Sequence, residues 1–280
     1  MTTGEEAGLE AQGATIGYDG RVISKALDVA IPAGELTVIV GPNACGKSTL
    51  LRALSRLIRP TEGRIVLDGH DISTLGTREV ARRLGLLPQT SIAPDGITVA
   101  DLVARGRHPH QRLWRQWSAD DERAVAEALE ATGVADLSGR LVDELSGGQR
   151  QRVWVALVLA QETPLLLLDE PTTFLDIAHQ IDLLELCRDL HADGRTLVAV
   201  LHDLNHACRY GTHLIAMRDG AVVAEGRPVD VITAELVEEV FGLPCQIIED
   251  PVYHTPLVIP VGRGVHPDVR VSGRTSGWRR

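Results

Sequence analysis

Residues 36–51, LTVIVGPNACGKSTLL, constrain the fold of this chain more than any other stretch. A short apolar run at residues 36–40 leads into a glycine-containing turn, and apolar residues at helical spacing follow it. Residues 41–48 fit the pattern G-x-x-x-x-G-K-[ST], which belongs at the junction between a strand and a helix. At such a junction free backbone N–H groups and the positive end of the helix dipole face a bound anion. The stretch therefore predicts an α/β protein that cradles a phosphate.

The side chains and backbone of this phosphate loop have separate expected roles. Lys47 is expected to reach the β- and γ-phosphates, the Ser48 hydroxyl to face Mg²⁺, and the backbone N–H groups of residues 43–49 to wrap the β-phosphate. Lys25 and Lys47 are the only two lysines in the sequence, and the other side chains counted among Lys and Arg are all arginine. We therefore do not regard Lys47 as an incidental lysine. Ala44 stands where many such loops have glycine, which raises a question about its backbone angles, whereas Cys45 is interpreted as a small filler. The predicted nucleotide contacts of the loop are Gly41, Asn43, Ala44, Cys45, Gly46, Lys47, Ser48 and Thr49.

Composition narrows the class of protein. With 280 residues, 44% of them hydrophobic, the chain can form one large or two modest domains. Its formal net charge of −10 argues against nonspecific nucleic-acid binding, which needs a basic face. The four cysteines form no C-x-x-C pair, which fits a reducing cytoplasm and suggests no zinc site. The N-terminus lacks a secretory pattern and no apolar run is long enough to span a bilayer, so membrane association is expected only through a partner.

Polar residues follow three further apolar runs, where a parallel sheet keeps its ligands. Asp169 is expected to hold the Mg²⁺ shell and Glu170 to polarise the attacking water, although two carboxylates could also simply cap the strand. Gln89 could touch Mg²⁺ or that water, or cap its loop. His202 is expected to point into the same cleft. His202 and His206 resemble a metal pair in spacing, but a strand end and the following helix do not give them a common face.

Residues 145–152, LSGGQRQR, predict a second anion-binding turn at a helix N-terminus. The glycines after Ser146 let a phosphate approach the backbone closely. Because the sequence already contains one phosphate loop, this second turn implies that both anion-binding turns bind the same ligand.

The rest of the chain completes the expected organisation. Residues 9–31 predict an antiparallel ribbon, with β-like pieces at residues 14–17 and 22–31. Tyr18, in the turn between them, could stack on an adenine base or lie at the solvent edge. Residues 90–160 predict a helical insertion within a single domain spanning residues 1–262, and residues 263–280 are expected to be disordered. The basic and aromatic stretch at residues 105–117 is either a partner contact or a solvated loop.

The ordered set GPNACGKST, Gln89, LSGGQ, LLLLDEP, TTFLD and His202 resembles the nucleotide-binding subunit of an ATP-binding cassette (ABC) transporter. The resemblance covers nearly the whole chain. It implies an ABC ATPase fold, in which a P-loop NTPase core carries an antiparallel β subdomain and a helical signature subdomain, and it implies ATP and Mg²⁺ as ligands. The implied catalytic residues are Glu170, His202 and Gln89, the implied metal contacts are Ser48, Gln89 and Asp169, and the implied nucleotide contacts add Tyr18, Ser146, Gly147, Gly148 and Gln149 to the loop.

The same resemblance implies partners. The family works as head-to-tail dimers, which would explain two cradles, because each ATP would lie between the phosphate loop of one copy and the signature turn of the other. Integral membrane permease subunits would hold the protein at the cytoplasmic face of the cell membrane as a peripheral subunit. A periplasmic or lipid-anchored substrate-binding protein would act indirectly, and no nucleic acid is expected.

A finer resemblance is to the ATPases of ferric-siderophore importers, of the ferric-enterobactin kind. It rests on VARGRHPHQ, PTTFLDIAHQIDLLEL, VLHDLNHACRY and DPVYHTPLVIP, parts of which heme and cobalamin importers share. A soluble ATPase acting on ribosomes or DNA would show two cassettes or a long coiled coil, and an exporter half would carry its own membrane segment. Residues 90–117, with Arg112 and Trp114, are the predicted permease contact; the alternative is a loop that packs on its own helical subdomain.

Overall fold

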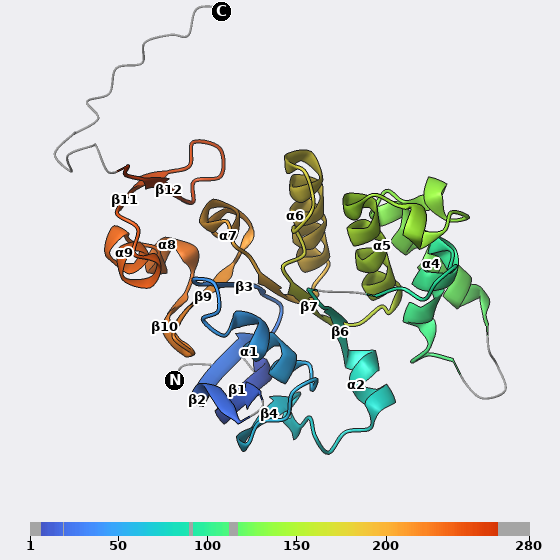
Figure 1. Ribbon diagram of the computed structural model, residues 1–280, viewed down its shortest axis with the longest axis horizontal. Helices are drawn as coiled ribbons and strands as arrows, with labels where there is room; N and C mark the ends of the chain where they lie inside the picture. The colour runs from blue at the N-terminus through green and yellow to red at the C-terminus, as the bar shows by residue number, and fades with distance from the viewer. Residues whose placement is uncertain (1–6, 19, 90–91, 112–116, 263–280) are drawn as a thin grey trace, which may run out of the picture.

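The fold, seen in a computed structural model, is described for residues 7–18, 20–89, 92–111 and 117–262. A six-stranded sheet, with strand order β10-β9-β3-β8-β7-β6, lies at its centre (Figure 1). A four-stranded sheet of order β2-β1-β4-β5 lies on one side of it, and helices α5, α6 and α7 lie on the other. The helices are α1 (Lys47–Leu54), α2 (Thr77–Arg83), α3 (Val99–Ala104), α4 (Ala119–Ala131), α5 (Gly147–Ala160), α6 (Ile177–Ala192), α7 (Leu204–Tyr210), α8 (Pro228–Val231) and α9 (Ala234–Phe241).

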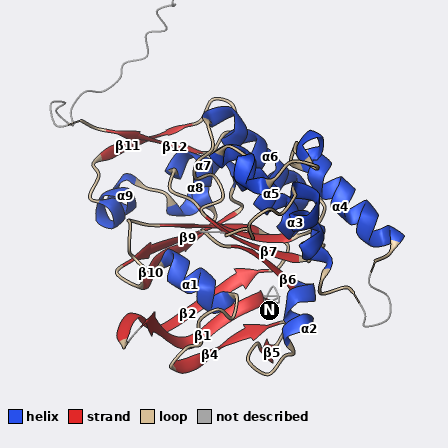
Figure 2. Cartoon of the chain, turned by 45° about the vertical axis from the view of Figure 1, so that its right-hand side comes forward, coloured by secondary structure: helices blue, strands red, loops and turns tan. Residues whose placement is uncertain are grey.

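The central sheet is parallel except for its last strand, β10, which pairs antiparallel with β9. All residues of β3 and β7 are buried, because helices cover one face and the second sheet with α1 covers the other. The continuous apolar runs of the sequence are therefore strands buried on both faces (Figure 2). The strands are β3 (Leu36–Val40), β6 (Leu84–Leu87), β7 (Leu165–Asp169), β8 (Thr196–Val200), β9 (His213–Arg218) and β10 (Ala221–Gly226).

The antiparallel sheet contains the ribbon predicted at residues 9–31, but its first strand is longer than the predicted piece at residues 14–17. That strand begins at Ala7, and register shifts interrupt its pairing with β2. One side of this sheet shares a buried core with α1 and with the side of β3 that Ile39 faces. Its strands are β1 (Ala7–Tyr18), β2 (Arg21–Pro32), β4 (Glu62–Leu67) and β5 (His70–Asp71).

The helical insertion consists of α3, α4 and α5 with three short 3₁₀ turns, at Arg105–Arg107, Ala135–Leu137 and Val142–Glu144. Ser118 caps α4, in a capping box with Asp121. Arg107, which the sequence groups with a basic loop, is only 4% exposed. Its guanidinium donates to Asp121 Oδ1 at 2.8 Å and to Glu162 Oε2 at 2.7 Å. Burial opposes the charge of Asp121, but the hydrogen bonds from Arg107 and Ser118 outweigh it and hold the pKa of Asp121 below its usual value.

The C-terminal part begins with two separate helices, α8 and α9. Thr233 caps a new helix after Ile232, so α9 does not continue α8. Beyond them β11 (Cys245–Glu249) and β12 (Pro256–Pro260) form a hairpin that contacts α7 (Figure 1). None of the helices in the described residues has the length and hydropathy that crossing a bilayer requires.

Candidate active site

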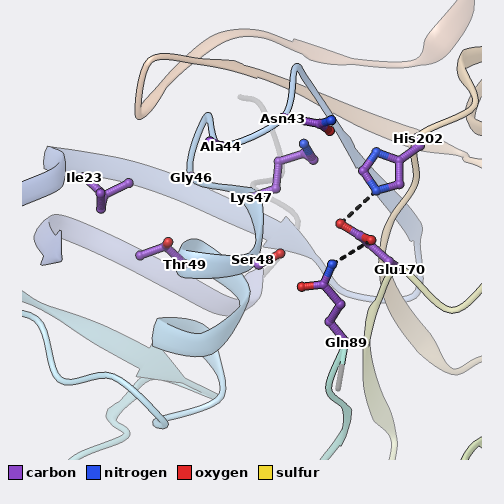
Figure 3. Close-up of a pocket in the computed structure, with 10 residues that line it drawn as sticks. All are labelled: Ile23, Asn43, Ala44, Gly46, Lys47, Ser48, Thr49, Gln89, Glu170 and His202. Atoms are coloured by element: carbon purple, nitrogen blue, oxygen red, sulfur yellow. Dashed lines mark hydrogen bonds and ion pairs between the residues drawn. The ribbon is translucent and has the colours of Figure 1, made fainter. Parts of the chain in front are cut away.

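A cavity of about 490 Å³ opens where β3, β6, β7 and β8 end (Figure 3). The carboxyl ends of parallel strands lie at one edge of a sheet, so segments far apart in the sequence meet there. The cavity contains most of the residues expected at a nucleotide site. Its lining residues are Ile23, Asn43, Ala44, Gly46, Lys47, Ser48, Thr49, Gln89, Glu170 and His202.

The phosphate loop joins β3 to α1 as predicted. Gly41 lies so close to β9 that a Cβ there would stand 2.2 Å from the carbonyl oxygen of Met217. Ala44 has a φ of 61°, in the left-handed region that glycine favours. This answers the question raised by its identity: alanine occupies a glycine-like conformation at this point of the loop. Lys47 is 5% exposed, and its ammonium donates to the carbonyl oxygens of Gly41 and Pro42, both at 2.8 Å.

Asp169 lies directly behind the loop. Its Oδ1 accepts a hydrogen bond from Ser48 Oγ at 2.8 Å, and the residue is 1% exposed. Its Oδ2 is buried and has no hydrogen-bond partner among the described residues. Burial raises the pKa of Asp169, and the nearby Glu170 charge adds to that effect against the Ser48 hydrogen bond. A buried carboxylate oxygen without a partner, beside a serine hydroxyl, fits a divalent cation, which would satisfy the oxygen and favour its ionised form.

Glu170 contacts the other two predicted catalytic residues, His202 and Gln89. His202 Nε2 lies 2.8 Å from its Oε1, and Gln89 Nε2 donates to its Oε2 at 2.8 Å (Figure 3). The side chain of Glu170 is 12% exposed, and its backbone has a φ of 52°, a conformation that non-glycine residues seldom adopt. A partly desolvated carboxylate held between an imidazole and an amide can accept a proton from a water at this edge of the sheet.

Tyr18, the expected adenine contact, is not among the residues that line this cavity. Its hydroxyl accepts a hydrogen bond from Arg52 Nη1 at 3.2 Å. Ile23, on β2, lines it instead, and sequence reasoning missed this residue. The only signal available was its position in the predicted ribbon, because the approach of β2 to Gly46 is a tertiary contact.

The signature turn lies outside this cavity. Ser146 caps α5 in a capping box with Gln149, whose backbone N–H it binds at 3.3 Å. Gly147 lines a second cavity, of about 520 Å³, which shares Gln89 with the first and runs between α5 and the loop that carries Phe174. One copy of the chain therefore does not bring its two predicted anion-binding turns onto one ligand.

The two histidines with metal-like spacing have different neighbours. The His206 ring lies edge-on to Tyr210, with 6.5 Å between the ring centres, while the His202 ring faces Glu170. Within residues 7–18, 20–89, 92–111 and 117–262, no group of three His, Cys, Asp or Glu side chains is arranged to hold a metal ion.

Comparison with known proteins shows the family to which this chain belongs. The sequence model of the family described as "ABC transporter" matches residues 24–173. This chain belongs to the ABC transporter family. It is 57% identical, over 258 residues, to the "Ferric enterobactin transport ATP-binding protein FepC" of Escherichia coli (strain K12), an alignment that covers 92% of this chain and 95% of that protein. It is 41% identical, over 261 residues, to the "Hemin import ATP-binding protein HmuV" of Nocardia farcinica (strain IFM 10152), covering 91% and 90% of the two chains.

Solved structures agree with the ABC fold. A metal-chelate type ABC transporter in an inward-facing conformation matches with a TM-score of 0.77 at 27% identity, covering 91% of this chain and 98% of that one. A dimeric bacterial ABC transporter cassette matches with a TM-score of 0.70 at 28% identity, covering 78% and 98%. The ABC ATPase fold inferred from the sequence motifs is thereby confirmed, and the chain is an ATP-binding subunit of this family.

Proposed function

We propose that this ABC protein is the ATP-hydrolysing subunit of an importer that moves a ferric siderophore across the cytoplasmic membrane. The observation that carries the proposal is the 57% identity to the ferric enterobactin protein over nearly the full length of both chains. The alternative substrates are heme and cobalamin. Identity to the hemin import protein is lower, at 41%, which favours the siderophore.

Uptake in the native host tests this substrate. The gene is deleted and then complemented with the wild-type chain or with the Glu170→Gln chain. Uptake of labelled ferric siderophore should fall in the deletion strain and return only with the wild-type chain, while hemin and cobalamin uptake stay unchanged. Loss of hemin or cobalamin uptake, with siderophore uptake intact, would favour the alternative.

The residues of the cavity divide the work of hydrolysis. Lys47 and the loop N–H groups would bind the phosphates, and Ser48, Asp169 and Gln89 would hold Mg²⁺, which neutralises phosphate charge. Glu170 would act as the base for the attacking water, and His202 would contact the γ-phosphate. Both oxygens of Glu170 have partners, His202 at Oε1 and Gln89 at Oε2, so we expect one of these contacts to give way when the water binds.

A second copy of the chain would complete the site. The separation of the signature turn from the phosphate loop within one chain supports this, because residues 146–149 would then face the ATP of the partner. Phe174 and Ile177, in the loop and helix after Glu170, are 77% and 78% exposed and offer apolar surface for such a contact. The dimeric cassette among the solved structures supports the same assembly.

Permease subunits would hold the protein at the cytoplasmic face of the membrane, and a substrate-binding protein would act through them. The predicted contact is residues 90–117, of which Arg112 and Trp114 lie outside the described residues. The cavity of about 520 Å³ is lined by Gln89, which directly precedes this segment, and by residues of α5 and by Phe174. It borders both the helical insertion and the hydrolysis site, which supports docking beside residues 90–117.

Replacing Arg112 and Trp114 with alanine tests this contact. Trp and Arg contribute strongly to protein interfaces, so we expect transport with the permease to fall while the ATPase activity of the isolated subunit survives. Arg123→Ala, an exposed arginine on α4, is the matched control and should leave transport unchanged. Equal loss of both activities would make the segment structural, and unchanged transport would place the docking surface elsewhere.

A further inference from the structure

His202 depends on its backbone for its position. Its side chain is 47% exposed, so packing restrains the ring only in part, and the ring reaches Glu170 from the end of β8. The chain enters α7 immediately afterwards: Asp203 is the N-cap, and its carboxylate accepts the backbone N–H of His206. The direction in which His202 points is therefore set by the first turn of α7.

Asn205 fixes that first turn to the C-terminal hairpin. Its Oδ1 accepts the backbone N–H of Val258 at 2.7 Å, and its Nδ2 donates to the carbonyl oxygen of the same residue at 3.3 Å. The side-chain amide thus pairs with β12 as a neighbouring strand would. Val258 is 5% exposed and Asn205 is half-buried, so these hydrogen bonds lie in a partly buried contact where loss of either partner is costly.

The last turn of α7 is fastened to the same hairpin. Arg209 Nη2 donates to Asp250 Oδ2 at 2.7 Å, and the guanidinium carbon lies 4.4 Å from the centre of the Tyr253 ring. Asp250 also accepts the backbone N–H groups of Val252 and Tyr253. The Arg209 hydrogen bond leads these effects, and together they lower the pKa of Asp250 to about 2. Both ends of a seven-residue helix are therefore anchored to residues 245–260.

We propose that Asn205 is a positioning residue for ATP hydrolysis: with the β11–β12 hairpin it holds the first turn of α7 and thereby aims His202 at Glu170 and at the γ-phosphate. The hairpin would thereby support the hydrolysis site although none of its described residues lines the cavity. This inference rests on the proposed role of His202. An error of about 1 Å in the position of a catalytic group can cost a large part of its contribution, so a single amide can matter at a distance.

Asn205→Ala in the full chain tests the proposal. We expect kcat for ATP to fall on the order of tenfold, because His202 loses its aim. KM for ATP should stay unchanged, because, among the described residues, Asn205 makes no hydrogen bond to the phosphate loop. The Lys47 ammonium is held by carbonyl oxygens of that loop, whereas Asn205 binds β12. Asn205→Asp, which keeps an acceptor for the Val258 N–H, should retain more activity than Asn205→Ala. Glu249→Gln, on the same hairpin but bonded to His254 within it, is the control and should keep the wild-type kcat.

A double-mutant cycle separates positioning from simple loss of structure. If Asn205 acts through His202, then Asn205→Ala should add nothing to His202→Ala in single-turnover hydrolysis. Independent losses that multiply, or a wild-type kcat for Asn205→Ala, would overturn the inference while leaving the proposed function intact. Normal hydrolysis by His202→Ala would instead overturn the proposed role of His202, and the inference with it.

Discussion

Glu170→Gln should leave ATP binding intact while hydrolysis falls on the order of a hundredfold or more. Glutamine keeps the size of the side chain and can still bond to Gln89 or His202, but it cannot take a proton from water. Because bound ATP then persists, the variant should accumulate as a nucleotide-bound dimer. Equilibrium nucleotide binding, steady-state hydrolysis and size-exclusion chromatography with ATP measure the three effects.

A matched control is Glu225→Gln, an exposed glutamate on β10 that does not line the cavity. It should bind and hydrolyse ATP as the wild type does. If purified Glu170→Gln hydrolysed ATP at a near-normal rate, Glu170 would not be the base.

Mixing two inactive variants should restore hydrolysis if the composite site is correct. Lys47→Ala removes the ammonium from the phosphate loop, and Ser146→Arg removes the cap of α5 and places a bulky side chain at the signature turn. In a head-to-tail heterodimer one site carries both lesions and the other carries neither. An equimolar mixture with random pairing should therefore hold about a quarter of the wild-type number of intact sites.

ATP turnover of the mixture, compared with each variant alone, is the measurement. Two differently tagged Lys47→Ala chains provide the control, since their dimers contain no intact site. If turnover never rises above that of the separate variants, either the sites are not shared in this way or both sites of a dimer must be intact.

The sequence predicted which residues meet at the carboxyl edge of the sheet better than it predicted their surroundings. Gln89, Glu170 and His202 were placed together because each follows a buried parallel strand, and such strands end at one edge. The burial of Arg107 could not be predicted, because it depends on Asp121 and Glu162 from other parts of the helical subdomain. The absence of Tyr18 from the cavity and the presence of Ile23 depend in the same way on how β1 and β2 approach the loop. Local patterns predict elements and their ends, whereas packing between distant elements decides which side chains face a cavity.

The place of β3 at the centre of the sheet has a consequence for synthesis of the protein. Its neighbours are β8 and β9, so Leu36 pairs with Leu197 and Thr37 with His213. During translation β3 is synthesised well before β8 and β9, which follow it by more than half the length of the chain. Such non-local strand pairing slows folding. The antiparallel sheet needs only residues up to Asp71 and can pair much earlier. We therefore expect a nascent chain to bind ATP only after β9 has left the ribosome.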